Sequence, residues 1–123
     1  MVKNNPIVDK SKAFAVKIVK QCQEIQDLQR EYVLTKQLLR SGTSIGANVK
    51  EAVHGVSKPD FYNKLNIALK EACETEYWLE LLHECDYLHI TAFDSIYADC
   101  QELIKLLTSI TKTQKSKKDE RSE

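Results

Sequence analysis

Apolar residues recur every three or four positions through most of the chain, which is the spacing of one face of an α-helix. Four such stretches cover roughly 9–29, 33–54, 59–84 and 91–112, with short polar breaks between them. No stretch shows the clear alternation of a β-strand. Four helices of about 20 residues, each about 30 Å long and joined by short turns, predict an all-α, antiparallel up-down-up-down four-helix bundle.

Each predicted helix carries an apolar line that should face the bundle core. The lines of the first two helices are Phe14, Ile18, Cys22, Ile25 and Leu28, and then Leu38, Ile45, Val49, Ala52 and Val56. The last helix, 91–112, spreads its apolar residues over more than one stripe. One core need not cover all of that surface, so self-association is expected.

Turn and capping residues set the expected helix ends. Gly55 can adopt the left-handed conformation that ends a helix. Pro59 suits a first helical turn, and Ser57 with Asp60 has the spacing of a capping box. A similar pair should start the last helix at Thr91. The bundle domain is therefore predicted over 9–112, after an N-terminal segment 1–8 and before a charged tail, 113–123, that is predicted to be disordered.

An unusual helical run lies at 40–52, where Gly42 and Gly46 stand four positions apart. Glycine in a helix interior costs about 1 kcal/mol relative to alanine, so these residues predict close approach of another helix. A polar line runs beside the apolar one and needs partners, because unpaired buried polar groups are costly. We call this line and its expected partners the central polar seam: Gln37, Arg40, Ser44, Asn48, Glu51, Glu71 and Glu74. It could fix helix register or contact a ligand or nucleic acid.

Composition narrows the partners and the compartment. The chain has 123 residues, with 18 basic and 18 acidic side chains, so its net charge is zero. That balance argues against strong general affinity for nucleic acid or anionic membranes. No apolar stretch reaches the length of about 20 residues that a membrane span needs, and the first residues lack the apolar core of a signal peptide. The four cysteines form no Cys-x-x-Cys pair, so buried free thiols and a cytoplasmic location are expected.

The candidate chemistry is sparse. Two Glu-x-x-His pairs, Glu51 with His54 and Glu80 with His83, have the spacing of di-iron sites. They should lie at opposite ends of antiparallel helices, on the order of 30 Å apart, so no metal site is expected. No nucleophile with a base and no phosphate-binding loop is evident, so we expect no enzyme activity, cofactor or small-molecule substrate. Nucleic-acid contact stays open through Lys17, Lys20, Lys36, Arg40 and Lys50.

Three runs carry a family resemblance: 34–41 (LTKQLLRS), 44–52 (SIGANVKEA) and 68–79 (ALKEACETEYWL). They resemble a bacterial four-helix-bundle family named for proteins encoded in intervening sequences of large-subunit ribosomal RNA genes. Accessory proteins of diversity-generating retroelements are related to it. The resemblance implies a homopentameric ring without known catalytic residues. The retroelement members are basic and work with a reverse transcriptase and its RNA.

The zero net charge of this chain departs from the basic retroelement pattern. The resemblance therefore implies an oligomeric scaffold or adaptor of the intervening-sequence branch. An RNA- or DNA-binding accessory protein is the alternative.

Overall fold

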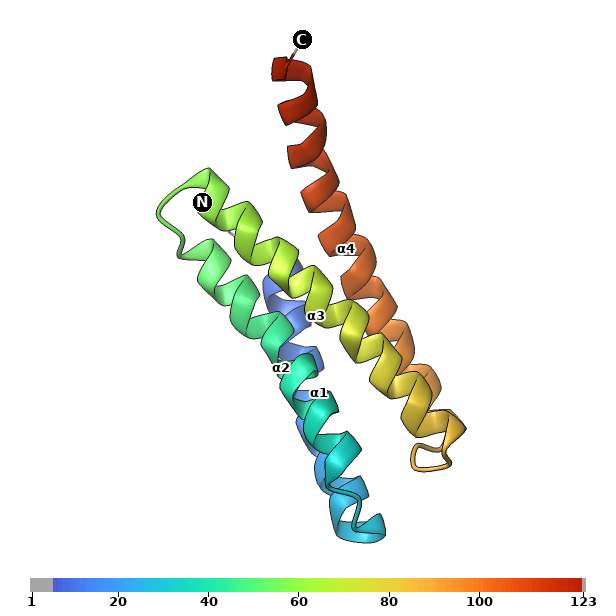
Figure 1. Ribbon diagram of the computed structural model, residues 1–123. Helices are drawn as coiled ribbons and strands as arrows, with labels where there is room; N and C mark the ends of the chain where they lie inside the picture. Colours follow the sequence, from blue (N-terminus) through green and yellow to red (C-terminus); the bar gives the residue numbers. More distant parts are fainter. Residues whose placement is uncertain (1–5, 123) are drawn as a thin grey trace.

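The computed structural model describes the backbone of residues 6–122 and the side chains of residues 6–113. Within that part the chain forms α1 (Pro6–Gln29), α2 (Val33–Val53), α3 (Lys58–Glu84) and α4 (Ile90–Ser122). Consecutive helices pack antiparallel, and α4 also contacts α1 (Figure 1). The contact between α1 and α4 is the least extensive of the four. The predicted all-α four-helix bundle is confirmed.

The helix starts follow local side-chain chemistry. The backbone N–H of Asp60 donates to Ser57 Oγ at 3.2 Å, so the predicted cap of α3 is present. Glu31 caps α2, since its carboxylate accepts from the N–H groups of Leu34 and Thr35 at 2.7 and 2.8 Å. The start predicted for the last helix is one residue late, because α4 begins at Ile90.

The turn residues differ from the sequence expectation. Gly55 does not have a positive φ; its N–H donates to the carbonyl of Ala52 at 3.0 Å instead. The left-handed residues are Arg30 (φ 52°), after α1, and Asp86 (φ 66°), after α3. The prediction for Gly55 is therefore wrong, because His54, at φ −103°, already ends α2 without a left-handed turn.

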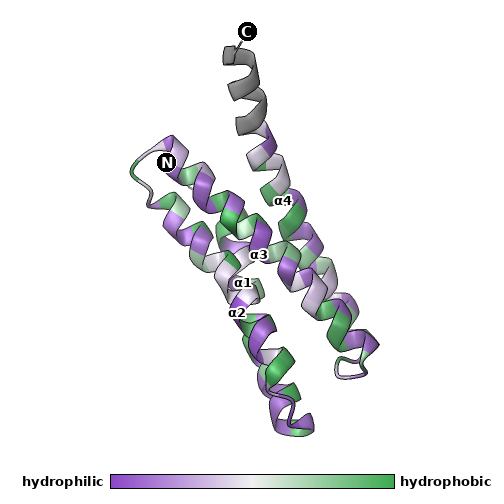
Figure 2. Cartoon of the chain, in the orientation of Figure 1, coloured by the Kyte–Doolittle hydropathy of each residue, from purple (hydrophilic) through white to green (hydrophobic). Residues whose placement is uncertain are grey.

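The apolar lines meet in one core, and Figure 2 shows hydrophobic and hydrophilic residues sharing each helix. Leu38, Leu79 and Leu107 are fully buried. Leu28 and Val56 were expected in the core but are 76% and 95% exposed. Leu28 lies in the last turn of α1 and Val56 in the turn after α2, where no helix covers them.

The cysteines divide into two buried and two exposed residues. Burial raises the pKa of the Cys22 and Cys100 thiols to about 12. Cys73 and Cys85 are exposed, which contradicts the expectation that all four are buried. Cys73 stands beside the buried Ala72, one helical step away from the core face.

The ends of the chain differ from the predicted bounds. α1 begins at Pro6, three residues early, and Ile7 is buried in the core. Residues 1–5 lie outside the described residues. The backbone of α4 continues as helix beyond the expected end at 112, while the side chains of 114–123 are not described. The predicted disorder of 113–123 stays a prediction. None of the helices described is long and apolar enough to cross a membrane.

Candidate functional site

The two central glycines lie where α2 approaches α1. A Cβ atom placed on Gly42 would be 2.9 Å from Ile18 Cγ2, and one on Gly46 would be 3.2 Å from the backbone oxygen of Ser11. Both distances are shorter than ordinary van der Waals contact between carbon or oxygen atoms. The absence of side chains at these positions therefore sets how closely α1 and α2 pack.

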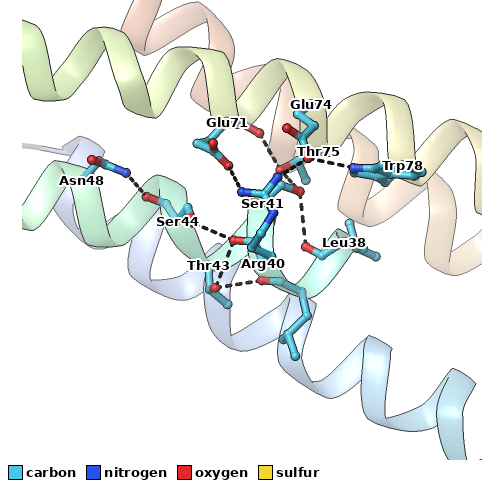
Figure 3. Close-up of polar contacts among 11 residues, drawn as sticks. Leu38, Arg40, Ser41, Thr43, Ser44, Asn48, Glu71, Glu74, Thr75 and Trp78 are labelled. Carbon is cyan, nitrogen blue, oxygen red and sulfur yellow. Dashed lines mark hydrogen bonds and ion pairs between the residues drawn. The ribbon is translucent and has the colours of Figure 1, made fainter. Parts of the chain in front are cut away.

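Arg40 joins α2 to α3 through two carboxylates (Figure 3). Its Nη1 donates to Glu71 Oε2 at 3.0 Å, and its Nη2 pairs with Glu74. Trp78 Nε1 donates to the same Glu74 oxygen at 3.0 Å. The hydrogen bond from Trp78 lowers the pKa of Glu74 below its usual range, and the charge and hydrogen bond of Arg40 lower it further. Burial acts in the opposite direction but is outweighed. The bond to Glu74 likewise raises the pKa of Arg40.

A hydroxyl pair lies beneath this ion-pair network. Thr75 Oγ1 and Ser41 Oγ share a hydrogen bond at 2.9 Å, and both residues are fully buried. Thr75 Oγ1 also donates to the carbonyl of Glu71 at 2.7 Å. Burial of these hydroxyls is tolerated because each has a partner, and the pair links α2 to α3 in one register.

The remaining residues of the central polar seam differ in whether their bonds connect two helices. Ser44 Oγ donates to the carbonyl of Arg40 at 2.6 Å, and Asn48 Nδ2 donates to that of Ser44 at 2.8 Å. Both bonds stay within α2, so they do not connect helices. Glu51 pairs with Lys64 of α3 at 3.2 Å. Gln37 is exposed and makes no side-chain hydrogen bond to any described residue. The cross-helix part of the seam is thus Arg40 and Glu51 with their partners.

The candidate nucleic-acid contacts are not gathered on one surface. Lys17 Nζ pairs with Asp99 at 2.6 Å across α1 and α4, and Arg40 pairs with the two carboxylates of Glu71 and Glu74. The other candidates, Lys20, Lys36 and Lys50, are exposed and form no ion pair with the side chains described. Positions 36 and 50 are about 21 Å apart along α2 at 1.5 Å per residue.

Glu80 and His83, one of the two Glu-x-x-His pairs, have other partners. The Tyr97 hydroxyl donates to the carboxylate of Glu80, and this bond, with burial, raises the pKa of Tyr97 to about 12. His83 Nδ1 lies 2.9 Å from the carbonyl of Leu88. Across the side chains of residues 6–113, no three His, Cys, Asp or Glu residues are grouped so that they could hold a metal ion.

Sequence reasoning missed Thr75, Trp78 and Lys64 as partners of the seam. Thr75 had a readable signal, because it lies three positions after Ala72 and four before Leu79 on the buried line of α3. A threonine on that line should seek a polar partner. Trp78 and Lys64 carry no comparable signal, since long side chains reach partners that spacing alone does not identify.

Comparison with known proteins shows which family the sequence resembles. The sequence model described as 23S rRNA-intervening sequence protein matches residues 3–109. A crystal structure from Bacteroides thetaiotaomicron VPI-5482, described as a protein with unknown function from the S23 ribosomal protein family, is 55% identical with a TM-score of 0.84. The similarity covers 86% of this chain and 98% of that one. No curated protein matches the sequence.

Proposed function

This chain belongs to the 23S rRNA-intervening sequence protein family, and we propose that it is a non-enzymatic cytoplasmic scaffold or adaptor that assembles with copies of itself. The family resemblance supports a pentamer. No cofactor or small-molecule substrate enters this proposal. The bundle would supply a rigid unit, held in register by the glycine contacts and the hydroxyl pair.

One observation carries the proposal: the outer face of α2 and α3 combines exposed apolar side chains with an arginine that is paired to two carboxylates. Ile67 is 42% exposed and Tyr77 is 55% exposed, and both belong to α3. Arg40 is already paired with Glu71 and Glu74 beside them. Covering this face would bury apolar area while Arg40 keeps its two carboxylate partners, which lowers the cost of desolvating that arginine.

The test replaces apolar side chains on this face. Ile67→Lys with Tyr77→Ala should lower the molar mass measured by light scattering at micromolar concentration. The matched control is Val16→Lys, on α1, where the native side chain is 45% exposed. Circular dichroism should show that all variants stay helical. If the wild type is oligomeric and the double variant has the same molar mass, this face is not the contact between copies, and the contact lies elsewhere.

Nucleic-acid binding is the second candidate, and the family resemblance to retroelement accessory proteins is what favours it. The pairing of Lys17 and Arg40 opposes it, because neutralised cations release few counterions on binding phosphate. Five copies in a ring could still combine weak contacts at Lys20, Lys36 and Lys50. Electrophoretic mobility of RNA and DNA at low salt separates the candidates, since the scaffold proposal expects no shift.

A further inference from the structure

A groove lies at one end of the bundle, between the last turns of α1 and the α3–α4 turn. Its volume is about 480 Å³. Apolar side chains form much of its lining: Ile25 and Leu28 from α1, with Leu88, Ile90 and Ala92 from the α3–α4 turn and the start of α4. Leu28 and Ile90 are 76% and 48% exposed. Large apolar side chains exposed side by side are typical of interaction surfaces.

One hydrogen bond joins the two sides of the groove, and two contacts of His83 fix the α3–α4 turn. Gln29 Nε2 donates to the carbonyl of Tyr87 at 2.8 Å, which connects the end of α1 to the α3–α4 turn. His83 Nδ1 contacts the carbonyl of Leu88 at 2.9 Å, and its ring stacks on Phe93 at 4.3 Å. A surface fixed in this way loses little conformational freedom when a partner binds.

The rim of the groove is acidic. Glu24 and Asp86 line it, and no lysine or arginine is among its lining residues. Asp27 and Glu84 stand in the last turns of α1 and α3. Within residues 6–113, none of these four carboxylates takes part in an ion pair.

Helix stability does not explain Asp27 and Glu84. α1 and α3 end at this face while α2 and α4 begin here, so dipole ends of both signs meet at it. Asp27 and Glu84 lie in the last turns of α1 and α3, at the negative ends, where lysine or arginine would be stabilising, and α1 has no basic residue in its last turn. Glu31 is different, because its carboxylate caps α2. The unpaired carboxylates raise the negative potential around an apolar floor.

We propose that this end groove docks a basic amphipathic segment of a partner protein. Apolar side chains of the segment would cover Leu28 and Ile90, and its lysine or arginine residues would lie against Glu24 and Asp86. The inference rests on the proposed adaptor role and names the chemistry of the partner. Nucleic acid does not fit an acidic rim. The basic tail of this chain does not fit the floor, because 111–123 (TKTQKSKKDERSE) contains no large apolar residue.

The probe is a fluorescein-labelled peptide of about 18 residues, long enough for about 27 Å of helix, with leucine and lysine at amphipathic spacing. Fluorescence anisotropy with the full chain should show saturable binding. Leu28→Ser, and separately Glu24→Gln with Asp86→Asn, should each raise Kd about tenfold. Asparagine suits position 86, since it tolerates the left-handed backbone there. A second peptide with glutamate in place of lysine should not bind.

The matched controls lie at the other end of the bundle. Val56→Ser removes an apolar side chain that is 95% exposed, and Asp9→Asn with Asp60→Asn removes the same number of charges as the groove variant. These controls should leave Kd unchanged. No saturable binding, or equal loss in controls and groove variants, would overturn the proposal.

Two further outcomes separate this proposal from the scaffold proposal. If Leu28→Ser lowers the molar mass of the protein alone, the occupant of the groove is a second copy, and the docking of a partner segment is refuted. If the wild type is monomeric yet binds the peptide through the groove, the self-assembling scaffold fails and the docking surface stands.

Discussion

The closeness of α1 and α2 predicts that Gly42→Ala destabilises the protein, although alanine is the better helix former. Replacing a helical glycine with alanine gains about 1 kcal/mol. The new methyl would lie 2.9, 3.0 and 3.4 Å from three carbons of Ile18, a side chain that is fully buried. Overpacking of this kind costs about 1–3 kcal/mol. The net effect should be a loss of up to about 2 kcal/mol in the free energy of unfolding.

A double-mutant cycle tests that explanation. Ile18→Ala removes Cγ1 and Cγ2, the two carbons nearest to the new methyl, at a cost of about 2–5 kcal/mol and leaves only Cβ, at 3.4 Å. In that background Gly42→Ala should become stabilising by about 1 kcal/mol, because only the helix preference remains. Ile18→Val is the matched control: it keeps both branches at Cβ, so it should not relieve the clash.

The assay is guanidinium unfolding followed by fluorescence of Trp78, the single tryptophan, at one fixed protomer concentration. The coupling between positions 18 and 42 should be about 1–3 kcal/mol. Stabilisation of the wild type by Gly42→Ala, or the same effect in all three backgrounds, would refute the claim that glycine is needed for helix contact here.

Three further predictions follow from neighbouring features. Gly46→Leu should lower the melting temperature and disturb assembly, whereas Ala47→Leu on the exposed side should do neither; equal melting temperatures would contradict the packing account. The pKa of Glu74 is lowered in the folded state, so its contribution to stability is present above its unfolded pKa and lost as pH falls through the folded value. Glu74→Gln should therefore flatten the acid limb of a stability–pH curve, and an unaltered limb would show that Glu74 does not contribute. Ellman's reagent should titrate two thiols in the native protein and four in denaturant, since two cysteines are exposed and two buried; four fast thiols would refute that burial.

The fold was predictable from periodicity because each buried line continues over several turns. Ile18, Ile45 and Leu79 each lie on such a line, in α1, α2 and α3, and all three are fully buried. The same spacing misplaced Leu28, because periodicity gives the direction of a side chain and not where the neighbouring helix ends. Gly55 was misjudged for a related reason: glycine permits a left-handed turn, while the actual turn depends on how α3 meets α2.

The candidate site was predictable only in outline. The sequence predicted that Arg40 would pair with Glu71 and Glu74, because opposite charges beside a core are stabilised by pairing, and the structure contains both ion pairs. Ser44 and Asn48 have the same polar spacing, yet they bond to carbonyls of their own helix. Short polar side chains can hydrogen-bond either to a carbonyl of their own helix or to a neighbouring helix. The rotamer of the side chain decides which of these two bonds forms, and the sequence does not give the rotamer.

The central claim is that the chain acts as a self-assembling scaffold, and native mass spectrometry of the full-length protein at micromolar concentration tests it most directly. One chain has a mass of 14.1 kDa. The account predicts a discrete complex, with five copies as the expected number. A single species at 14.1 kDa across that concentration range would contradict it.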